Sequence, residues 1–372
     1  MNSAENRPIP LSAGATEPTV NGIDAFLKQV LMKGGSDLHF IAGDLPRIRL
    51  HGELLTLQNK PLEASFVEKL LLEIIPQASL QRFREKHGAD FAYIIPGVSR
   101  FRVNVMRHIN GFGAVFRAIP THAKSMSDLK LPETINNLCK LKSGLILVTG
   151  KTGSGKSTTL AAMIDDINRR MKGHIVTIED PIEFVHSRKN SLISQREIGL
   201  HTPSFADALK SALREDPNVI LVGEMRDHET ISIAVTAAEM GILVMGTLHT
   251  NGAAATVDRI VNSFPADKQP QVRSMLSTSL RGVISQQLIP TKKQSGRIAA
   301  MEIMINTPAV ANLIRQGKLD QLENTIQSGS SSGMRTMDMA IEELLDKGLI
   351  TGQNAYLKAI NKSKFESVKD LT

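Results

Sequence analysis

The stretch Gly150-Lys-Thr-Gly-Ser-Gly-Lys-Ser157 decides the fold of this chain. It follows the apolar run Leu-Ile-Leu-Val at 145–148, and the residues after it, 158–170, carry apolar positions at helical spacing. A buried strand that leads into a glycine-rich turn and then into a helix is the setting in which such a turn binds phosphate groups. The sequence therefore predicts that the chain binds a nucleoside triphosphate.

The residue types in this loop suit the parts of a triphosphate. Glycines let backbone N–H groups curl around phosphate oxygens, and the helix N-terminus adds partial positive charge. Lys156 is expected to reach the β- and γ-phosphates, and the Ser157 hydroxyl is expected to bind Mg²⁺. The expected nucleotide-binding residues are Gly150, Thr152, Gly153, Ser154, Gly155, Lys156, Ser157 and Thr158.

Beyond the loop, short apolar runs alternate with helical segments. Strands are expected at Leu145, Ile175, Val219 and Ile242, which is typical of a parallel sheet covered by helices on both faces. Sheets of this kind bind their ligands at the carboxyl ends of the strands. The predicted fold class is therefore α/β, with further helices from Thr307 onward.

Three of these strands end in residues that suit phosphoryl transfer. The first ends in Glu179, Asp180 and Glu183, carboxylates that could handle a metal ion or an attacking water, although a solvated acidic turn would look the same. The second ends in Glu224, where loop-type nucleotide hydrolases hold their metal, and a carboxylate of this length would reach Mg²⁺ through a water. The third is followed by His249, which could donate a hydrogen bond to the γ-phosphate.

The N-terminal third of the chain has a different pattern. Residues 1–21 are rich in Pro, Ser, Ala and Thr without periodicity, which predicts a disordered tail. An amphipathic helix from residue 22, strand-like alternation and a helix over 62–75 predict a smaller mixed α+β domain over 22–119. The polar residues 120–130 are expected to link it to the ATPase domain, 131–372.

An arginine pair in the first domain is a further candidate for the site. In the segment 99–105, Arg100 and Arg102 share one face of an expected strand, while Phe101, Val103 and Val105 share the other. The apolar face would pack into the domain and the two guanidinium groups would point away from it. Pattern alone leaves open an ordinary solvated edge. Arg117 is a weaker third candidate.

Composition limits the classes of function. Lys and Arg number 44 against 37 Asp and Glu, a formal net charge of +7, which would suit nucleic acid or an anionic membrane. An ATPase that lines its phosphate sites with arginine accounts for the same excess. Aromatic residues make up 4% of the chain and Trp is absent, which disfavours a surface that stacks bases, so no nucleic-acid partner is expected.

The lack of a long apolar stretch and of a signal-peptide core predicts a location inside the cell. The single cysteine, Cys139, excludes an intramolecular disulfide or a cysteine zinc cluster, and its apolar neighbours predict a core position. No apolar stretch approaches the roughly twenty residues that span a bilayer, and the N-terminus has no signal-peptide core. The protein is expected to be cytoplasmic.

Four boxes in fixed order resemble the secretion ATPase superfamily. They are the phosphate loop, Thr177-Ile-Glu-Asp-Pro-Ile-Glu183, Val222-Gly-Glu-Met-Arg-Asp227 and Thr247-Leu-His-Thr-Asn251. Within this superfamily the chain is similar to the type IV pilus retraction ATPases, the PilT family of twitching motility. The resemblance runs from Gly22 to about Ile350 and takes in Gly-Gly-Ser-Asp-Leu-His at 34–39 and Ser-Arg-Phe-Arg at 99–102.

This resemblance implies roles for the candidate residues. It implies a RecA-like ATPase core that uses ATP and Mg²⁺, with Glu183 as the general base or water-orienting carboxylate, Glu224 as the Walker B acid and His249 as the γ-phosphate sensor. Arg100 and Arg102 would come from a PAS-like first domain to ATP held between subunits. The family also implies a homo-hexamer that works peripherally at the inner membrane on a platform protein, with a paralogous pilus ATPase as a further candidate partner.

Two features bear on the branch of the superfamily. Assembly ATPases usually carry an extra N-terminal domain and a four-cysteine zinc site, and this chain has neither, which favours the retraction branch. The retraction motif Ala-Ile-Arg-Asn-Leu-Ile-Arg-Glu reads Ala-Val-Ala-Asn-Leu-Ile-Arg-Gln at 309–316, so it keeps Arg315 but has Ala311 and Gln316.

The predicted function is an oligomeric motor that hydrolyses ATP to power pilus retraction and twitching motility. An auxiliary motor, or an ATPase of a type IVB secretion or conjugation system, is an alternative within the superfamily. A partner that binds ATP without useful hydrolysis, and a DNA translocase, are alternatives from other classes.

Overall fold

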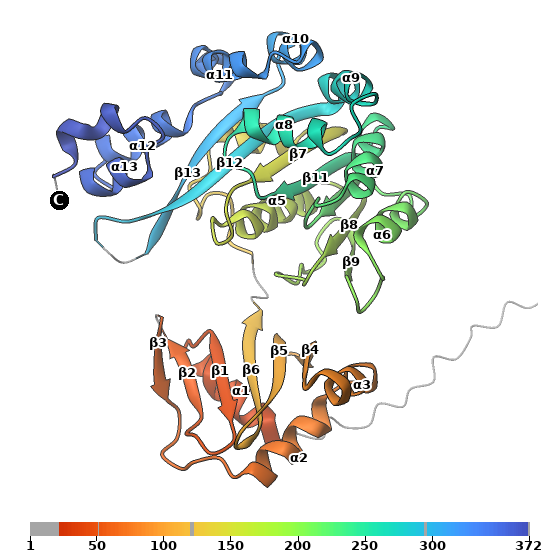
Figure 1. Ribbon diagram of the computed structural model, residues 1–372, viewed down its shortest axis with the longest axis vertical. Coiled ribbons are helices and arrows are strands. Elements are labelled where there is room, and N and C mark those ends of the chain that lie inside the picture. The colour runs from red at the N-terminus through yellow and green to blue at the C-terminus, as the bar shows by residue number, and fades with distance from the viewer. Residues whose placement is uncertain (1–21, 51, 120–122, 294–295, 371–372) are drawn as a thin grey trace, which may run out of the picture. The chain divides into compact units, whose positions relative to one another are not determined.

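The structure, a computed structural model, describes residues 22–50, 52–119, 123–293 and 296–370 (Figure 1). The chain divides into two compact units, Met1–Pro120 and Thr121–Thr372, and each is described by itself. The predicted tail over 1–21 lies outside the described residues, as do residues 120–122 of the predicted linker. Among the helices described, none is long and apolar enough to cross a membrane.

The N-terminal unit contains an antiparallel sheet with helices packed on one face, which agrees with the expected mixed α+β domain. Its strands are β1 (Asp37–Ile41), β2 (Arg47–Leu50), β3 (Glu53–Thr56), β4 (Gly88–Ile95), β5 (Ser99–His108) and β6 (Gly111–Ile119). They lie in the order β3-β2-β1-β6-β5-β4. Its helices are α1 (Gly22–Met32), α2 (Ala64–Ile74) and α3 (Gln77–Lys86). The sequence did not predict α3, because its apolar Leu80 and Phe83 stand in an otherwise polar segment.

The core of this unit follows from the alternation along the strands. On β5, Phe101, Val103 and Val105 are fully buried, whereas Arg102 between them is exposed. The buried side chains join those of α1, α2 and α3 in one apolar cluster. The expected division of β5 into a packed face and an arginine face is confirmed.

The C-terminal unit is built on a seven-stranded sheet in the order β13-β12-β7-β11-β10-β8-β9. The strands are β7 (Gly144–Thr149), β8 (His174–Glu179), β9 (Leu192–Glu197), β10 (Val219–Val222), β11 (Leu243–Leu248), β12 (Leu280–Pro290) and β13 (Arg297–Ile305). All neighbours pair in parallel except β12 and β13. The predicted α/β fold with a parallel sheet is confirmed, and β9, β12 and β13 are additions to it.

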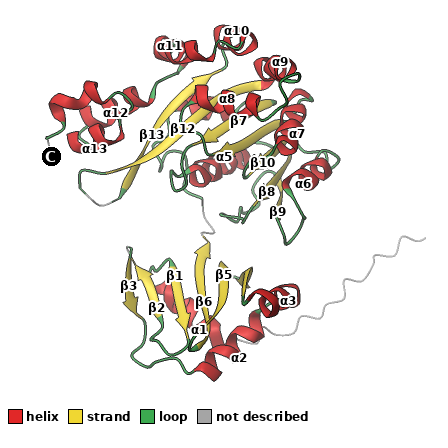
Figure 2. Ribbon diagram, in the orientation of Figure 1, coloured by secondary structure: helices red, strands yellow, loops and turns green. Residues whose placement is uncertain are grey.

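Helices cover both faces of this sheet, as Figure 2 shows. One face packs against α4 (Glu133–Cys139) and α5 (Lys156–Arg170). The other packs against α6 (Phe205–Ala212), α7 (His228–Glu239), α8 (Ala253–Asn262), α9 (Gln269–Ser279), α10 (Pro308–Gln316) and α11 (Leu322–Ser328). The last helices, α12 (Met337–Asp346) and α13 (Gly352–Lys358), pack with residues of β12 and β13 in a cluster of their own.

The structure also places three parts of the C-terminal unit that were singled out from the sequence: the predicted linker, Cys139 and the segment 309–316. Within the predicted linker, Met126 is buried in the cluster beneath α4 and α5, and Leu129 packs against that cluster, so this stretch belongs to the packed unit. Cys139 is buried in the same cluster, as predicted, and burial raises the pKa of its thiol to about 12. The segment 309–316 lies in α10, where Arg315 Nε donates to the Ser277 hydroxyl at 3.3 Å.

Candidate active site

The phosphate loop joins β7 to α5 in a shape that its glycines allow. Gly150, Gly153 and Gly155 have φ of +138°, +78° and +92°, a region that other residues rarely adopt. A Cβ on Gly150 would lie 2.2 Å from the Gln286 backbone oxygen, and one on Gly155 would lie 2.6 Å from Gln286 Nε2. The loop can take this path only with glycine at these two positions.

The polar groups of the loop fit a bound phosphate. Lys156 is buried and donates from Nζ to the Gly150 carbonyl at 2.8 Å and to the Lys151 carbonyl at 3.3 Å. Burial lowers its pKa, and the charge of Glu224 counteracts part of that shift. The buried Ser154 hydroxyl has no hydrogen-bond partner among the described residues, while Ser157 at the start of α5 is exposed. A cation held near free polar groups at a helix N-terminus suits an anion.

Gln286 on β12 is a site residue that the sequence did not predict. Its Nε2 donates to the Ser154 carbonyl at 2.7 Å, and its Oε1 accepts from the Thr159 hydroxyl at 2.7 Å. The side chain therefore links the phosphate loop to the first turn of α5, from a strand 132 residues away from Ser154 in sequence. Sequence offers no signal for this contact, because it arises from the pairing of β12 with β7.

Glu224 lies just after β10, beside an arginine, a histidine and the lysine of the phosphate loop. Its carboxylate accepts from Arg226 Nη2 at 2.6 Å, and its Oε1 lies 3.0 Å from His249 Nε2. Burial alone would raise the pKa of Glu224, but Arg226, His249 and Lys156 outweigh burial and hold the pKa below its usual value. Glu224 is therefore a charged acid that faces the phosphate-loop lysine, as its predicted position requires.

His249 follows β11, the strand between β7 and β10 in the sheet. The Thr247 hydroxyl donates to the Gly223 carbonyl at 2.6 Å, which ties the end of β11 to the end of β10. His249 is itself partly exposed, with 41% of its side-chain surface accessible. The structure thus brings His249, Glu224 and Lys156 together at one edge of the sheet.

The acidic segment after β8 separates into a buried and an exposed acid. Glu179 is buried, accepts from the Thr177 hydroxyl at 2.7 Å and from the Glu183 backbone N–H at 3.3 Å, and has a pKa raised by burial. Glu183 is exposed, and no hydrogen bond or ion pair recorded among the described residues joins its carboxylate to the phosphate loop. Glu179 therefore supports the segment, and Glu183 remains free to meet a water.

The candidate arginines lie in the other unit. Arg100 and Arg102 are on β5, where Arg102 Nε lies 4.0 Å from Asp90 Oδ1 with both side chains about half exposed. Arg117 on β6 donates from Nε to Asp37 at 2.8 Å, and this partner holds Arg117 within its own sheet. Arg102 and Arg117 each have an aspartate partner within the same sheet.

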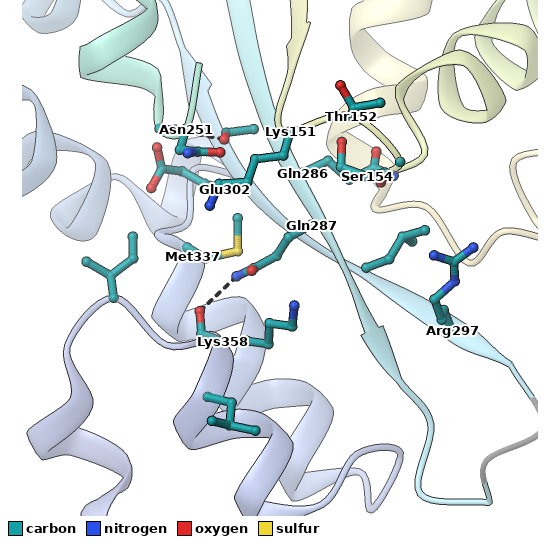
Figure 3. A pocket seen from close by; sticks show the side chains of 16 residues that line it. Lys151, Thr152, Ser154, Asn251, Gln286, Gln287, Arg297, Glu302, Met337 and Lys358 are labelled. Carbon is teal, nitrogen blue, oxygen red and sulfur yellow. Dashed lines mark hydrogen bonds between the residues drawn. The ribbon is translucent and has the colours of Figure 1, made fainter. Parts of the chain in front are cut away.

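A pocket of about 500 Å³ borders the phosphate loop. Figure 3 shows Ser154 of the loop apart from Asn251, Glu302 and Met337, with the Lys151 side chain extending toward Asn251 and Glu302. None of the predicted catalytic acids lines it. Lys156, Glu224 and His249 do not line this pocket either. Its walls come from the phosphate loop, β12, β13 and the last helices.

Comparisons with known proteins bear on this site. The family described as Type II/IV secretion system protein matches residues 13–355. The type IV pilus retraction ATPase PilT of Pseudomonas aeruginosa is 52% identical over 327 residues, which are 88% of this chain and 95% of that protein. The twitching motility protein of Neisseria gonorrhoeae is 51% identical over 321 residues, 86% of each chain. A crystal structure of the pilus retraction motor PilT with bound ADP has a TM-score of 0.86 at 44% identity, over 92% of this chain and 98% of that one.

The matched range 13–355 spans the phosphate loop, the three strand ends and the arginine strand. These likenesses confirm the resemblance seen in the sequence boxes and the prediction of an ATP-hydrolysing enzyme with a nucleotide site. The chain belongs to the type II/IV secretion system protein family and, within it, to the PilT-like pilus retraction ATPases.

Proposed function

We propose that this chain is one subunit of an oligomeric motor that hydrolyses ATP to retract type IV pili. The convergence of Lys156, Glu224 and His249 at the carboxyl ends of three neighbouring strands carries this proposal. Phosphoryl transfer is catalysed mainly by positioning and by positive charge, and this cluster supplies both. The relatives whose names mention pilus retraction and twitching motility supply the direction of work.

In the proposed reaction a water attacks the γ-phosphorus of ATP in line with the leaving ADP. The new P–O bond forms as the bond to the β-phosphate oxygen breaks, and Glu183 orients the water and accepts its proton. Lys156 leaves the loop carbonyls for the phosphates, and His249 donates to a γ-phosphate oxygen. Ser157, and Glu224 through a water, would hold Mg²⁺, which neutralises charge on the phosphates when bound.

Arg100 and Arg102 are proposed to reach the ATP of a neighbouring subunit in a homo-hexamer. Arginines in this role raise turnover by roughly 10³ to 10⁵. Co-expression of Arg102→Ala with Lys156→Ala subunits tests the arrangement, because each variant is expected to be inactive alone. Activity returns in mixed rings if the arginine acts between subunits, and stays absent if it acts within one. The force would pass to a platform protein at the inner membrane.

Glu183→Gln is the main test of the motor. Nucleotide binding, measured with a fluorescent ADP analogue, is expected to be unchanged, while steady-state phosphate release falls by more than about 100-fold. Glu229→Gln is a matched control, since Glu229 is an exposed carboxylate on α7 that pairs with Lys210. Unchanged hydrolysis in Glu183→Gln would remove this carboxylate from the mechanism.

The same variant tests the direction of work in cells. Bacteria that carry Glu183→Gln as the sole copy are expected to keep surface pili and to lose twitching, because extended filaments can no longer be withdrawn. Loss of surface pili would instead assign the chain to filament assembly.

A further inference from the structure

The loop that carries His249 is anchored at its far end by the two strands at the edge of the sheet. We call residues 249–252 the histidine loop, and the antiparallel pair β12 and β13 the ribbon. The Gly252 backbone N–H donates to the Ser285 hydroxyl at 2.8 Å, and the Ala253 N–H donates to Glu302 Oε1 at 2.7 Å. Ser285 and Glu302 are direct partners across the ribbon. Two neighbouring side chains thus hold the point where the histidine loop becomes α8.

Glu302 also lies at the start of a second helix. The backbone N–H of Met337, the first residue of α12, is close enough to its carboxylate to favour the charged form. The side chain is 6% exposed, and burial raises its pKa although the N–H groups of Ala253 and Met337 counteract part of the shift. A carboxylate between two helix N-termini satisfies their free N–H groups and meets their partial positive charge. Figure 3 shows it on the wall of the pocket beside the phosphate loop.

We propose that Glu302 is a positioning residue for ATP hydrolysis: it holds the histidine loop so that His249 faces the phosphates, and it ties that loop to α12. The inference rests on the proposed role of His249 as the group that contacts the γ-phosphate. The contacts of Glu302 with Ala253 and Met337 make the position of His249 depend on the last helices of the chain.

Contacts within and next to the histidine loop connect His249 directly to the N-terminus of α8. His249 at one end meets Glu224 at 3.0 Å, and Thr250 in the middle bonds the Thr256 hydroxyl at 2.7 Å on the first turn of α8. Thr256 also lies 3.4 Å from Thr149, the last residue of β7. A displacement of the α8 N-terminus would therefore move the loop that carries His249. Misplacement of a reacting group by about 1 Å can cost about 100-fold in rate.

Two substitutions at Glu302 compare the loss of both hydrogen-bond acceptors with the loss of the charge alone. Glu302→Leu keeps the volume and removes both acceptors, whereas Glu302→Gln keeps one carbonyl oxygen. We expect kcat to fall about tenfold in Glu302→Leu and about threefold in Glu302→Gln, with the Kd for an ATP analogue changed less than about twofold. Glu342→Gln is the matched control, because Glu342 is a half-exposed carboxylate of the same helix α12 that pairs with Lys364 at 2.6 Å.

A double-mutant cycle with His249→Ala distinguishes positioning from loss of stability. If Glu302 acts through His249, then adding Glu302→Leu to His249→Ala lowers kcat no further, whereas a general loss of folded enzyme would multiply the two effects. Chemical denaturation reports the folded fraction of each variant. Ser285→Ala tests the same anchor through Gly252 should Glu302→Leu not fold, and we expect kcat to fall about threefold there.

The outcomes keep the two proposals apart. Full turnover in His249→Ala overturns the proposed role of His249, and this inference with it. Slow turnover in His249→Ala with normal kcat in Glu302→Leu, or in Ser285→Ala as its substitute, overturns only the inference. A tenfold change in Kd with unchanged kcat would also overturn it, since Glu302 would then act on nucleotide binding.

Discussion

The phosphate loop and the β12–β13 ribbon support one site by different means. The loop places its glycines, Lys156 and Ser157 within eight consecutive residues, so its chemistry is written in one short motif. The ribbon supplies Gln286 to the loop and Glu302 to the end of the histidine loop, across 132 and 49 residues of sequence. The groups of the phosphate loop are local in sequence, whereas the ribbon side chains that hold the loops in place are distant.

The largest effect is expected where the two regions meet, at Gly150. Gly150→Ala would place a Cβ 2.2 Å from the Gln286 backbone oxygen at a φ of +138°, so either the loop or the ribbon has to move. We expect the affinity for ATP to fall by more than about 100-fold, because the phosphate cradle would be lost. Equilibrium binding of a fluorescent ATP analogue measures this loss.

Gly153→Ala in the same loop is the control for this substitution. Gly153 has a φ of +78°, but no atom lies within 4 Å of its added Cβ. Only backbone strain of about 1–2 kcal/mol remains, so affinity should fall about tenfold or less. Equal losses at Gly150 and Gly153 would show that the ribbon places no constraint on the loop.

A smaller effect is expected from the ribbon side chain that holds the loop. Gln286→Leu leaves the Ser154 carbonyl and the Thr159 hydroxyl without their partner in a buried place, which typically costs about 1–3 kcal/mol. We expect ATP affinity to fall about tenfold, measured by titration calorimetry. Gln287→Leu, one residue along on the other face, loses only an exposed bond to the Lys358 carbonyl and should change affinity less than about twofold. Equal effects would mean that the ribbon acts through overall stability.

This division explains which parts of the fold could be predicted. Strands β7, β8, β10 and β11 are short, nearly continuous apolar runs because both of their faces are covered, and the sequence predicts all of them. β9 lies at the sheet edge and reads Leu-Ile-Ser-Gln-Arg-Glu, which has neither an apolar run nor a clear alternation. The ribbon escaped prediction because its polar residues, such as Gln286 and Glu302, interrupt the apolar pattern where they bind loops.

The site follows the same rule. Lys156, Glu224 and His249 could be found because each follows an apolar strand, and the parallel sheet brings such strand ends to one edge. The residue pattern alone could not separate Glu179 from Glu183, since Glu179 ends β8 and Glu183 follows only four residues later. Their difference is burial, and the buried Glu179 also accepts a hydrogen bond at 3.3 Å from Gln195 Nε2 of the unpredicted β9.

The segment between β8 and β9 contains a partly buried histidine that should make the unfolding free energy depend on pH. His186 in this segment is partly buried beside Asp165 and Lys189, and burial lowers its pKa to about 4. The unfolded chain takes up this proton near pH 6.5 and the folded chain only near pH 4, so stability falls as pH drops through that window. We expect a loss of ~2 kcal/mol, less than the full shift would give because the ring is partly solvated.

His186→Gln tests this expectation by urea denaturation at several pH values. The variant should lose less unfolding free energy than the natural protein between pH 7 and pH 4.5, while ATP turnover at pH 7.5 stays unchanged. Identical pH dependence in the variant and the natural protein would show that His186 is solvated in the folded state.

The smallest effect of a substitution is expected for Cys139→Ala, at a core position that the local apolar pattern did predict. Burial raises the pKa of its thiol to about 12, so at pH 8 the thiolate fraction is about 10⁻⁴ in the folded protein, against about a quarter at the unperturbed pKa of ~8.5. Alkylation with iodoacetamide should therefore be on the order of 10³ slower in the native protein than in urea. Cys139→Ala should lower the unfolding free energy by about 1 kcal/mol and leave turnover unchanged, since only apolar packing is lost. Rapid alkylation of the native protein would mean that α4 opens easily, and the local pattern would then have identified a buried residue without a stable core around it.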